Sequence, residues 1–386
     1  MLGACHDRLS PLMEREAADG AIPDDTRVDG NTSPQSWGAY AAGLAVGLCI
    51  GEIMLEVDDT SFDLDGGDTL ADGANAGPTL SLREALTIAA NHTERVAIRF
   101  SREVFPAEDP ATISIPPGCR VPWLENTCID GRHRGVIIDF EGAAPGADPL
   151  CTFELKHDSL MVGLELRALQ HEVRVMEGAQ LAGCRVNHDG WSITPAHPIE
   201  SVVATGSTIG PGNSFGGQTG VHMHESRMPR IHGNLFGVDP ITHTKIPLTT
   251  GVRLGSLSPP TEPLVIVDNT FASATGIDVW VGTGESSVVI VSRNEFTGQL
   301  GVRADAMLQP LRGRLQIGPH NVFATEVQAL ELNAADATIE RAGARANHYK
   351  RHLHRRGGHL HHEWADRTHD SRASWRVQLF GVCALP

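Results

Sequence analysis

Residues 269–280 read "NTFASATGIDVW", and this stretch decides the fold because its pattern returns along the chain. An Asn-x-Phe motif opens the stretch, and a short β-like run that starts at Gly276 follows it. The motif occurs five times, as Asn213-Ser-Phe215, Asn234-Leu-Phe236, Asn269-Thr-Phe271, Asn294-Glu-Phe296 and Asn321-Val-Phe323. Successive copies lie 21, 35, 25 and 27 residues apart. Repeats of about this length are typical of solenoids, in which each repeat packs on its neighbours.

A second β-like run follows each copy of the motif. The runs are "GVHMH" (220–224), "GVRLG" (251–255), "GIDVW" (276–280), "GVRAD" (301–305) and "ALELN" (329–333). Two upstream segments, "VGLELRA" (162–168) and "LAGCRVN" (181–187), are similar but degenerate. Short strands without a helical period predict an all-β fold, a single-stranded right-handed parallel β-helix whose coils stack about 4.8 Å apart. The signatures of leucine-rich repeats and of β-propellers are missing from the sequence.

The repeated residues have physical roles in such a stack. Each Phe is expected to point inward and to lie on the Phe of the next coil. Each Asn suits a sharp corner, because Asn tolerates left-handed backbone and its amide can pair with neighbouring coils. The Gly that precedes most second strands is expected at another corner.

One segment ahead of the repeats has apolar residues at helical spacing. In "PTLSLREALTIAANH" (78–92), Ser81 and Glu84 have the spacing of a capping box. The apolar face of the helix is then formed by Leu82, Ala85, Leu86 and Ala89. An open β-helix exposes its core and an unpaired strand edge, so it needs a terminal cap. We therefore predict that a helix over 81–91 covers the N-terminal end of the stack.

The cap region resembles a known family. The segment "LEVDDTSFDLDGGDTL…GPTLSLREALTIAAN" resembles the CSLREA-type N-terminal region that precedes right-handed, pectate-lyase-like β-helix repeats in exported bacterial proteins. Residues 81–85 match this motif letter for letter, but Leu80 stands where the family has Cys. That difference removes any disulfide the family forms at this position. The resemblance implies a secreted or cell-surface protein and names no reaction.

These patterns divide the chain into four parts. Residues 1–54 are interpreted as a leader, a tether and an apolar segment, and 55–115 as the cap. The coils are predicted over 116–340, and 341–386 form a basic, His-rich tail. The tail is predicted to be disordered or to result from a shifted reading frame. A metal site there is the less favoured interpretation, with ligands drawn from His352, His354, His359, His361 and His362.

The net charge of −16 is unevenly distributed. Residues 341–386 carry +6, from nine Lys and Arg against three Asp and Glu, so the other residues carry −22. Phosphate binding requires a basic surface, so this acidic body argues against nucleic acid as a partner. No cofactor is predicted, apart from Ca²⁺ if the protein is a lyase, and we expect a monomer.

The N-terminal segment and the cysteines bear on location. "MLGAC" (1–5) resembles a lipobox, which would make Cys5 a lipid anchor; either the true start lies upstream or the match is chance. The stretch 37–57 contains Glu52 and Glu56, so a packed segment is favoured over a membrane span. Cys119 and Cys128 either close a short disulfide loop or are two separate apolar residues.

Alternation along the second strands predicts two outward columns. Inward positions are taken by Val221, Val252, Ile277, Val302 and Leu330. The first outward column holds His222, Arg253, Asp278, Arg303 and Glu331, and the second holds His224, Gly255, Trp280, Asp305 and Asn333. The alternating charges of the first column favour an ion-pair ladder.

The functional interpretation of the same face is a polysaccharide groove. Trp280 would stack on a sugar ring, Trp191, His224 and Glu225 would contribute further contacts, and the arginines would hold carboxylates. The paired carboxylates of polygalacturonase-like hydrolases are missing from the sequence. We therefore expect an exported or surface-anchored protein that binds polysaccharide or matrix without catalysis. The alternative is a lyase or hydrolase of acidic polysaccharides, with catalytic candidates His222, Arg253, Asp278, Arg303 and Asp305.

Overall fold

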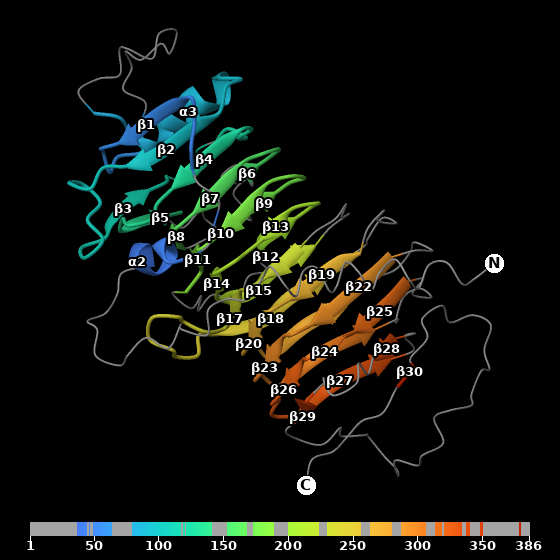
Figure 1. Ribbon diagram of the computed structural model, residues 1–386. Helices are drawn as coiled ribbons and strands as arrows, with labels where there is room; N and C mark the ends of the chain where they lie inside the picture. The colour runs from blue at the N-terminus through green and yellow to red at the C-terminus, as the bar shows by residue number, and fades with distance from the viewer. Residues whose placement is uncertain are drawn as a thin grey trace, which may run out of the picture. The chain divides into compact units, whose positions relative to one another are not determined.

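The computed structural model is nearly all parallel β-structure. It describes residues 37–44, 46, 49–63, 79–116, 119, 121–140, 153–167, 173–188, 200–223, 230–255, 263–279, 287–305, 313–318, 320–333, 337–339, 348–349 and 378–379. Within these residues the strands form three parallel sheets, which we name A, B and C, and the helices are α2 (Trp37–Ala42) and α3 (Leu82–Asn91). The predicted parallel β-helix with an N-terminal helix is confirmed (Figure 1).

Each sheet is built from strands of successive coils. Sheet A contains β1 (Ile53–Val57), β2 (Val96–Phe100), β4 (Thr127–Asp130), β7 (Leu160–Val162), β10 (Gln180–Ala182), β13 (Thr208–Ile209), β16 (Arg230–His232), β19 (Leu264–Val267), β22 (Ser287–Ser292), β25 (Gly313–Ile317), β28 (Ala337–Ile339) and β30 (Gln378–Leu379). Sheet B contains β3 (Ala111–Ser114), β5 (Val136–Asp139), β8 (Glu165–Arg167), β11 (Arg185–Val186), β14 (Ser214–Phe215), β17 (Leu235–Phe236), β20 (Thr270–Phe271), β23 (Glu295–Phe296), β26 (Val322–Phe323) and β29 (His348–Tyr349). Sheet C contains β6 (Glu154–Leu155), β9 (Val173–Val175), β12 (Glu200–Ala204), β15 (Gly217–Met223), β18 (Leu248–Leu254), β21 (Thr275–Val279), β24 (Leu300–Asp305) and β27 (Gln328–Asn333).

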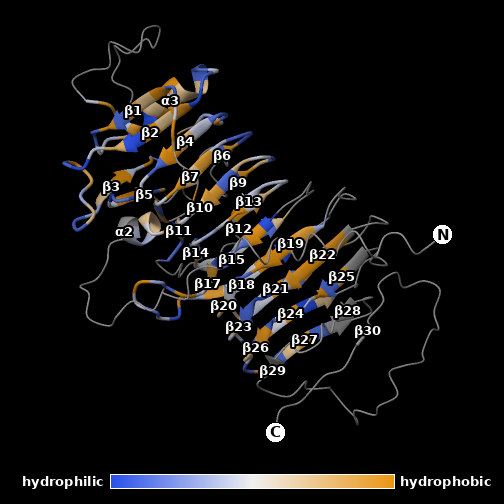
Figure 2. Ribbon diagram, in the orientation of Figure 1, coloured by the Kyte–Doolittle hydropathy of each residue, from blue (hydrophilic) through white to orange (hydrophobic). Residues whose placement is uncertain are grey.

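The repeated phenylalanines form one interior stack, as predicted. Successive ring centroids from Phe215 to Phe323 are 5.0, 4.7, 4.9 and 4.8 Å apart, and the interplanar angles are 13° or less. All five rings are buried and belong to one apolar core cluster. Hydrophobic residues recur along the strands of the sheets (Figure 2). The stack therefore fixes the register of one coil on the next.

The repeated asparagines form a buried ladder beside the phenylalanines. The Asn234 Nδ2 donates to Oδ1 of Asn269 at 3.0 Å, and that oxygen also accepts the backbone N–H of Asn234 at 3.0 Å. The left-handed residue at each corner is the one before the asparagine, as at Asp268 (φ 59°) and Arg293 (φ 55°). The predicted amide pairing is thus present, whereas the left-handed corner lies one residue earlier than predicted.

The glycines of the second strands are explained by packing and not by a corner. A Cβ on Gly276 would lie 2.6 Å from a ring carbon of Phe296 and 2.6 Å from the carbonyl oxygen of Gly301. A Cβ on Gly251 would likewise lie 2.6 Å from a ring carbon of Phe271. The expectation of a corner was wrong, because these glycines leave space for the Phe of the following coil.

Helix α3 caps the N-terminal end of the core. Ser81 Oγ accepts from the Glu84 N–H at 3.3 Å, and Glu84 Oε2 accepts from the Ser81 N–H at 2.8 Å, which confirms the capping box. Leu82, Ala85 and Leu86 are buried in the same cluster as the coil interior. The edge of sheet A beside the helix is β1, which pairs in parallel with β2.

The described residues of 37–57 form what we call the N-terminal strap. The indole Nε1 of Trp37 donates to the Gly183 carbonyl oxygen at 2.8 Å. Further along, a disulfide joins Cys49 to Cys128. The short Cys119–Cys128 loop considered from the sequence is therefore wrong: Cys119 remains a thiol, and Cys128 faces the strap on the outer side of sheet A. No helix among the described residues is long and apolar enough to cross a membrane.

Two strands fall in the segment that was predicted to be disordered. β29 pairs with β26 and β30 pairs with β28, both in parallel. The prediction of disorder is therefore wrong for these four residues. Main-chain hydrogen bonds to the last rungs do not need the Asn-x-Phe pattern, which explains why the sequence gives no signal for them. The five tail histidines considered as metal ligands lie outside the described residues.

Candidate functional site

The outward face of sheet C holds the predicted first column. The strand registers place His222 opposite Arg253, Arg253 opposite Asp278, Asp278 opposite Arg303, and Arg303 opposite Glu331. The predicted inward residues of this sheet are buried. Towards the N-terminal end the same column continues through Val203, Arg174 and Glu154.

The centre of this column is an ion-pair ladder. Arg303 binds both carboxylate oxygens of Asp278, through Nε at 2.9 Å and through a terminal nitrogen at 2.7 Å. The Nε of Arg253 lies 4.0 Å from the same carboxylate. Asp278 is 0% exposed. A carboxylate held in this way is neutralised and shielded, so it is poorly suited to take a proton from a substrate.

An exposed indole stands at the head of the same column. The bridge between Leu124 and Leu155 aligns Trp123 with Glu154, the first residue of β6. Trp123 is 62% exposed, and the Lys156 Nζ lies 3.6 Å from the centroid of its ring. Lys156 is held in turn by Glu154, with 3.4 Å between Nζ and Oε1. The arrangement combines an aromatic surface with a cation and an anion, each part-exposed.

The sequence prediction missed Trp123 because the residue belongs to no repeat. Its only signal is the alternation in "VPWLEN" (121–126), where a tryptophan precedes a leucine that turns out to be an interior residue. The predicted ligand residues Trp191, Trp280, His224 and Glu225 lie outside the described residues, as does Cys5. Asp305 ends β24, and only its backbone is described.

A second polar cluster lies on the outer face of sheet B. Ser214 Oγ is 2.7 Å from His188 Nε2, and His188 Nδ1 is 3.8 Å from Asp239 Oδ2. Arg185 lies between them, because its Nε donates to His188 Nδ1 at 2.6 Å and a terminal nitrogen donates to Asp239 at 2.9 Å. Glu165 also accepts from Arg185, at 3.2 Å.

This cluster has the residue types of a Ser-His-Asp triad, but its histidine has the wrong tautomer for that mechanism. A guanidinium only donates, so His188 Nδ1 accepts and the proton of the neutral ring is on Nε2. That tautomer cannot take a proton from Ser214, whose hydroxyl donates to the Val238 carbonyl oxygen at 2.6 Å. Ser214 is also 0% exposed. The cluster therefore holds Val238 and Asp239 against sheet B.

Among the residues that the structure describes, no three or more His, Cys, Asp or Glu side chains are grouped so that they could hold a metal ion. No family model matches the chain, and no curated protein matches its sequence.

Proposed function

We propose that this is an exported β-helix protein that binds a polysaccharide or surface glycan on the outward face of sheet C, without catalysis. The observation that carries the proposal is Trp123, an exposed indole at the head of the outward column. Large aromatic residues with one buried or occupied face and one accessible face are suited to stacking on flat, partly apolar ligands such as sugar rings.

The surroundings of Trp123 fit a sugar ligand. Lys156 lies over the indole ring, and Glu154 holds Lys156 in place. The ammonium group over the ring and the carboxylate that binds it supply donors and acceptors for hydroxyl groups. The next rung presents Arg174, which is exposed. A ligand that follows the column from Trp123 would thus meet Glu154 and then Arg174, before the column reaches the apolar Val203.

The buried state of Asp278 favours binding over a lyase or hydrolase mechanism. A general base must reach the proton that it takes, and Asp278 is enclosed with both oxygens bound by Arg303. The column acts as a ladder that aligns the rungs. Export is supported by the Cys49–Cys128 disulfide, because structural disulfides persist in oxidising compartments. Anchoring through Cys5 is part of the proposal that only the N-terminal sequence supports.

The experiment is affinity electrophoresis of the full chain in gels that contain a panel of neutral and acidic polysaccharides. At least one polymer should retard the wild type, and Trp123→Ala should weaken that binding by about tenfold. The matched control is Met54→Ala, which truncates another exposed apolar side chain, on β1. Retardation of Trp123→Ala equal to that of the wild type would refute the proposed face, and no retardation by any polymer would refute glycan binding.

A further inference from the structure

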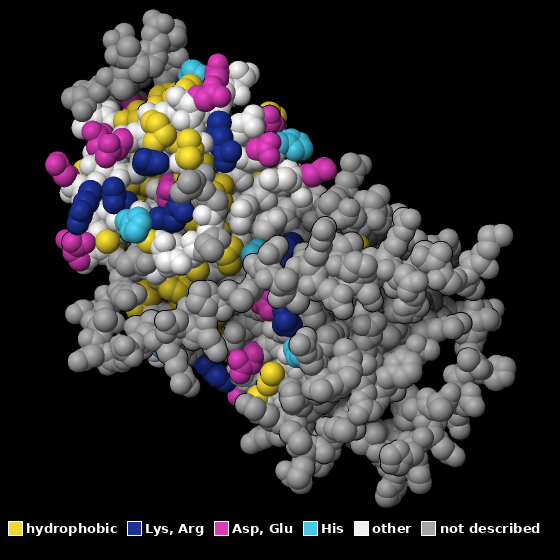
Figure 3. Space-filling view, in the orientation of Figure 1, with side chains coloured by type: hydrophobic (Ala, Val, Ile, Leu, Met, Phe, Trp, Pro, Cys, Tyr) yellow, Lys and Arg dark blue, Asp and Glu magenta, His cyan; other side chains and the backbone are white. Residues whose placement is uncertain are grey.

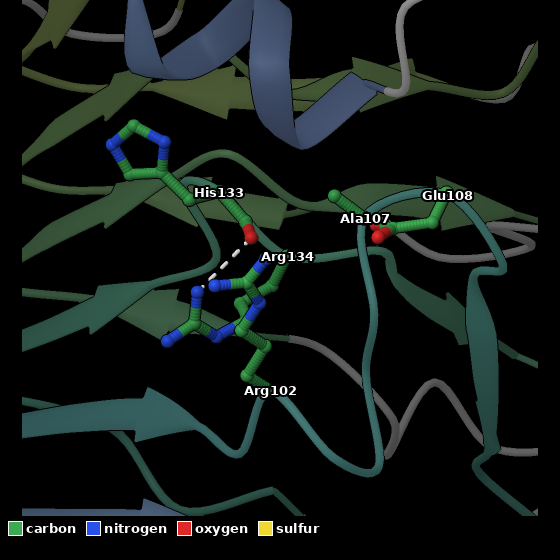
Figure 4. A pocket seen from close by; sticks show the side chains of 5 residues that line it. All are labelled: Arg102, Ala107, Glu108, His133 and Arg134. Atoms are coloured by element: carbon green, nitrogen blue, oxygen red, sulfur yellow. Dashed lines mark hydrogen bonds between the residues drawn. The ribbon is translucent and has the colours of Figure 1, made fainter.

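A hollow at the N-terminal end of the stack is unrelated to the sheet C face. It has a volume of about 390 Å³ and is lined by Arg102, Ala107, Glu108, His133 and Arg134. The first three come from the loop between β2 and β3, and the other two come from the turn between β4 and β5. In Figure 4 the two arginines lie together on one side of the hollow, and Ala107 and Glu108 lie on the other.

The two loops that form the hollow are locked together. Phe105 is buried and lies edge-on to Phe100 at 5.3 Å, so it anchors the first loop in the core. The Gly135 N–H donates to the Phe105 carbonyl oxygen at 3.2 Å. A Cβ on Gly135 would lie 2.5 Å from the Pro106 carbonyl oxygen, so only glycine allows this approach. The backbone of both loops, which carries the lining residues, is therefore held in place before any ligand arrives.

The arginines of the hollow differ from other arginines of the protein. Arg132 binds Asp130, and Arg293 binds Asp268, each through two hydrogen bonds. Neither Arg102 nor Arg134 has such a partner: within the described part of the chain no carboxylate oxygen lies within 4.0 Å of either. Among the described residues, Arg134 donates to two backbone carbonyl oxygens, those of Phe100 and His133, at 2.8 and 3.0 Å.

Two unneutralised guanidinium groups that share one hollow repel each other and favour an anion between them. The surrounding chain is acidic overall, which makes such a pair unusual here. Figure 3 shows Lys and Arg side chains and a histidine, with Asp and Glu side chains beside them, over β3 and β5. The planar fork of arginine matches a carboxylate, whose two oxygens can accept in parallel.

We propose that the hollow binds a small hydroxylated carboxylate, the chemical class of the sugar acids. The carboxylate would lie against Arg102 and Arg134. Glu108, across the hollow, only accepts hydrogen bonds when ionised, so it suits a ligand that also carries hydroxyl groups. The volume is in the range of small-molecule sites and exceeds the need of an inorganic anion. This site does not depend on glycan binding at Trp123.

The experiment is isothermal titration calorimetry of the full chain with D-galacturonate. Acetate serves as a probe for the carboxylate alone, and D-glucose as a probe for the hydroxylated ring alone. We expect galacturonate to bind at least about tenfold more tightly than either. Arg102→Gln should weaken galacturonate binding by about tenfold, because it removes a guanidinium group that would bind the carboxylate. The fold should stay intact, since the exposed Arg102 side chain forms no described contact that the fold needs. The matched control is Arg95→Gln, which removes the same charge from an exposed arginine at the other end of β2 and should change nothing.

Several results would contradict the proposed sugar-acid site. Acetate binding as tightly as galacturonate would mean a plain counter-ion site, and equal binding of glucose would mean that the arginines are not used. Equal affinities of wild type, Arg102→Gln and Arg95→Gln for galacturonate would place binding elsewhere. Since the probes are monomers and the variant lies away from Trp123, these outcomes are independent of the polysaccharide test.

Discussion

Two kinds of side chain align each coil with the next, and they do so by different physics. Phe271 contributes a ring that lies flat between the rings of Phe236 and Phe296. Asn269 contributes an amide that pairs with both neighbouring coils. The rings supply apolar burial, while the amides satisfy backbone groups that the corner would leave unpaired inside the core. Both are needed because a ring alone does not satisfy a buried N–H.

Truncation of one ring should show how much the phenylalanine stack contributes to the free energy of unfolding. Phe271→Ala should lower the free energy of unfolding by about 3–5 kcal/mol, because it leaves a cavity between two fixed rings. Urea denaturation followed by circular dichroism measures the change. Thr270→Ala on the same strand is a suitable control, since this side chain is part-exposed. A loss below about 1 kcal/mol for Phe271→Ala would mean that the rings do not share one close-packed interior.

His232 should make the fold sensitive to mild acid. Burial, with a smaller contribution from the charge of Arg230, lowers the pKa of His232 to about 4 from its ordinary value of 6.5. Between these two pH values His232 is protonated in the unfolded chain but stays neutral in the folded chain. The free energy of unfolding therefore decreases as the pH falls from about 6.5 to 4. The histidine should account for at most about 3 kcal/mol of that loss.

The measurement compares urea denaturation of wild type and His232→Gln at several pH values. The difference in unfolding free energy between the two proteins should move in favour of the variant as the solution is acidified. Carboxylates titrate in the same range, but they titrate in both proteins and cancel in the difference. Parallel pH curves for the two proteins would show that His232 is not held neutral by the fold.

The N-terminal strap is the element that the repeats do not explain. It begins at α2, beside Gly183, and ends as β1, which pairs with β2. Between them, Cys49 packs on outward apolar residues of four sheet A strands: Ala97, Cys128, Leu160, Val162 and Ala182. The strap therefore covers an apolar strip that a regular solvent-facing sheet would not have.

Loss of the disulfide should weaken this element strongly. Cys49 and Cys128 are 79 residues apart, so the bond restricts a long loop in the unfolded chain. Cys49→Ser should lower the free energy of unfolding by up to about 4–5 kcal/mol. A reducing agent should have the same effect on the wild type, and Cys119→Ser, which touches no disulfide, should have little effect. Equal denaturation curves for wild type with and without reductant would contradict a bond formed in solution.

The molecule as a whole could be predicted from sequence wherever the signal is periodic. The Asn-x-Phe copies predict the interior stack because each rung repeats the same local environment, and Ser81 with Glu84 predicts a helix start because a capping box is local. The pairing of Cys49 with Cys128 could not be predicted, since the strap crosses several rungs without a pattern of its own. Trp123 was missed for the same reason.

The candidate site was predictable only in part. Alternation placed Asp278 and Arg303 in one outward column, and the register confirms that placement. Alternation does not report whether an outward residue is covered, and Asp278 is fully buried. The hollow around Arg102 was not predictable, because it depends on two loops that Gly135 allows to meet.

One measurement separates a glycan-binding solenoid from a polysaccharide lyase built on the same coils. The wild type is incubated with a panel of uronate polymers, with and without Ca²⁺, while bound polymer and the ultraviolet absorbance of unsaturated sugar product are followed together. We expect retained polymer and no rise in absorbance under any condition, because Asp278 is enclosed and neutralised by Arg303. A rise in absorbance that Asp278→Asn abolishes would contradict this account and make the column a catalytic site.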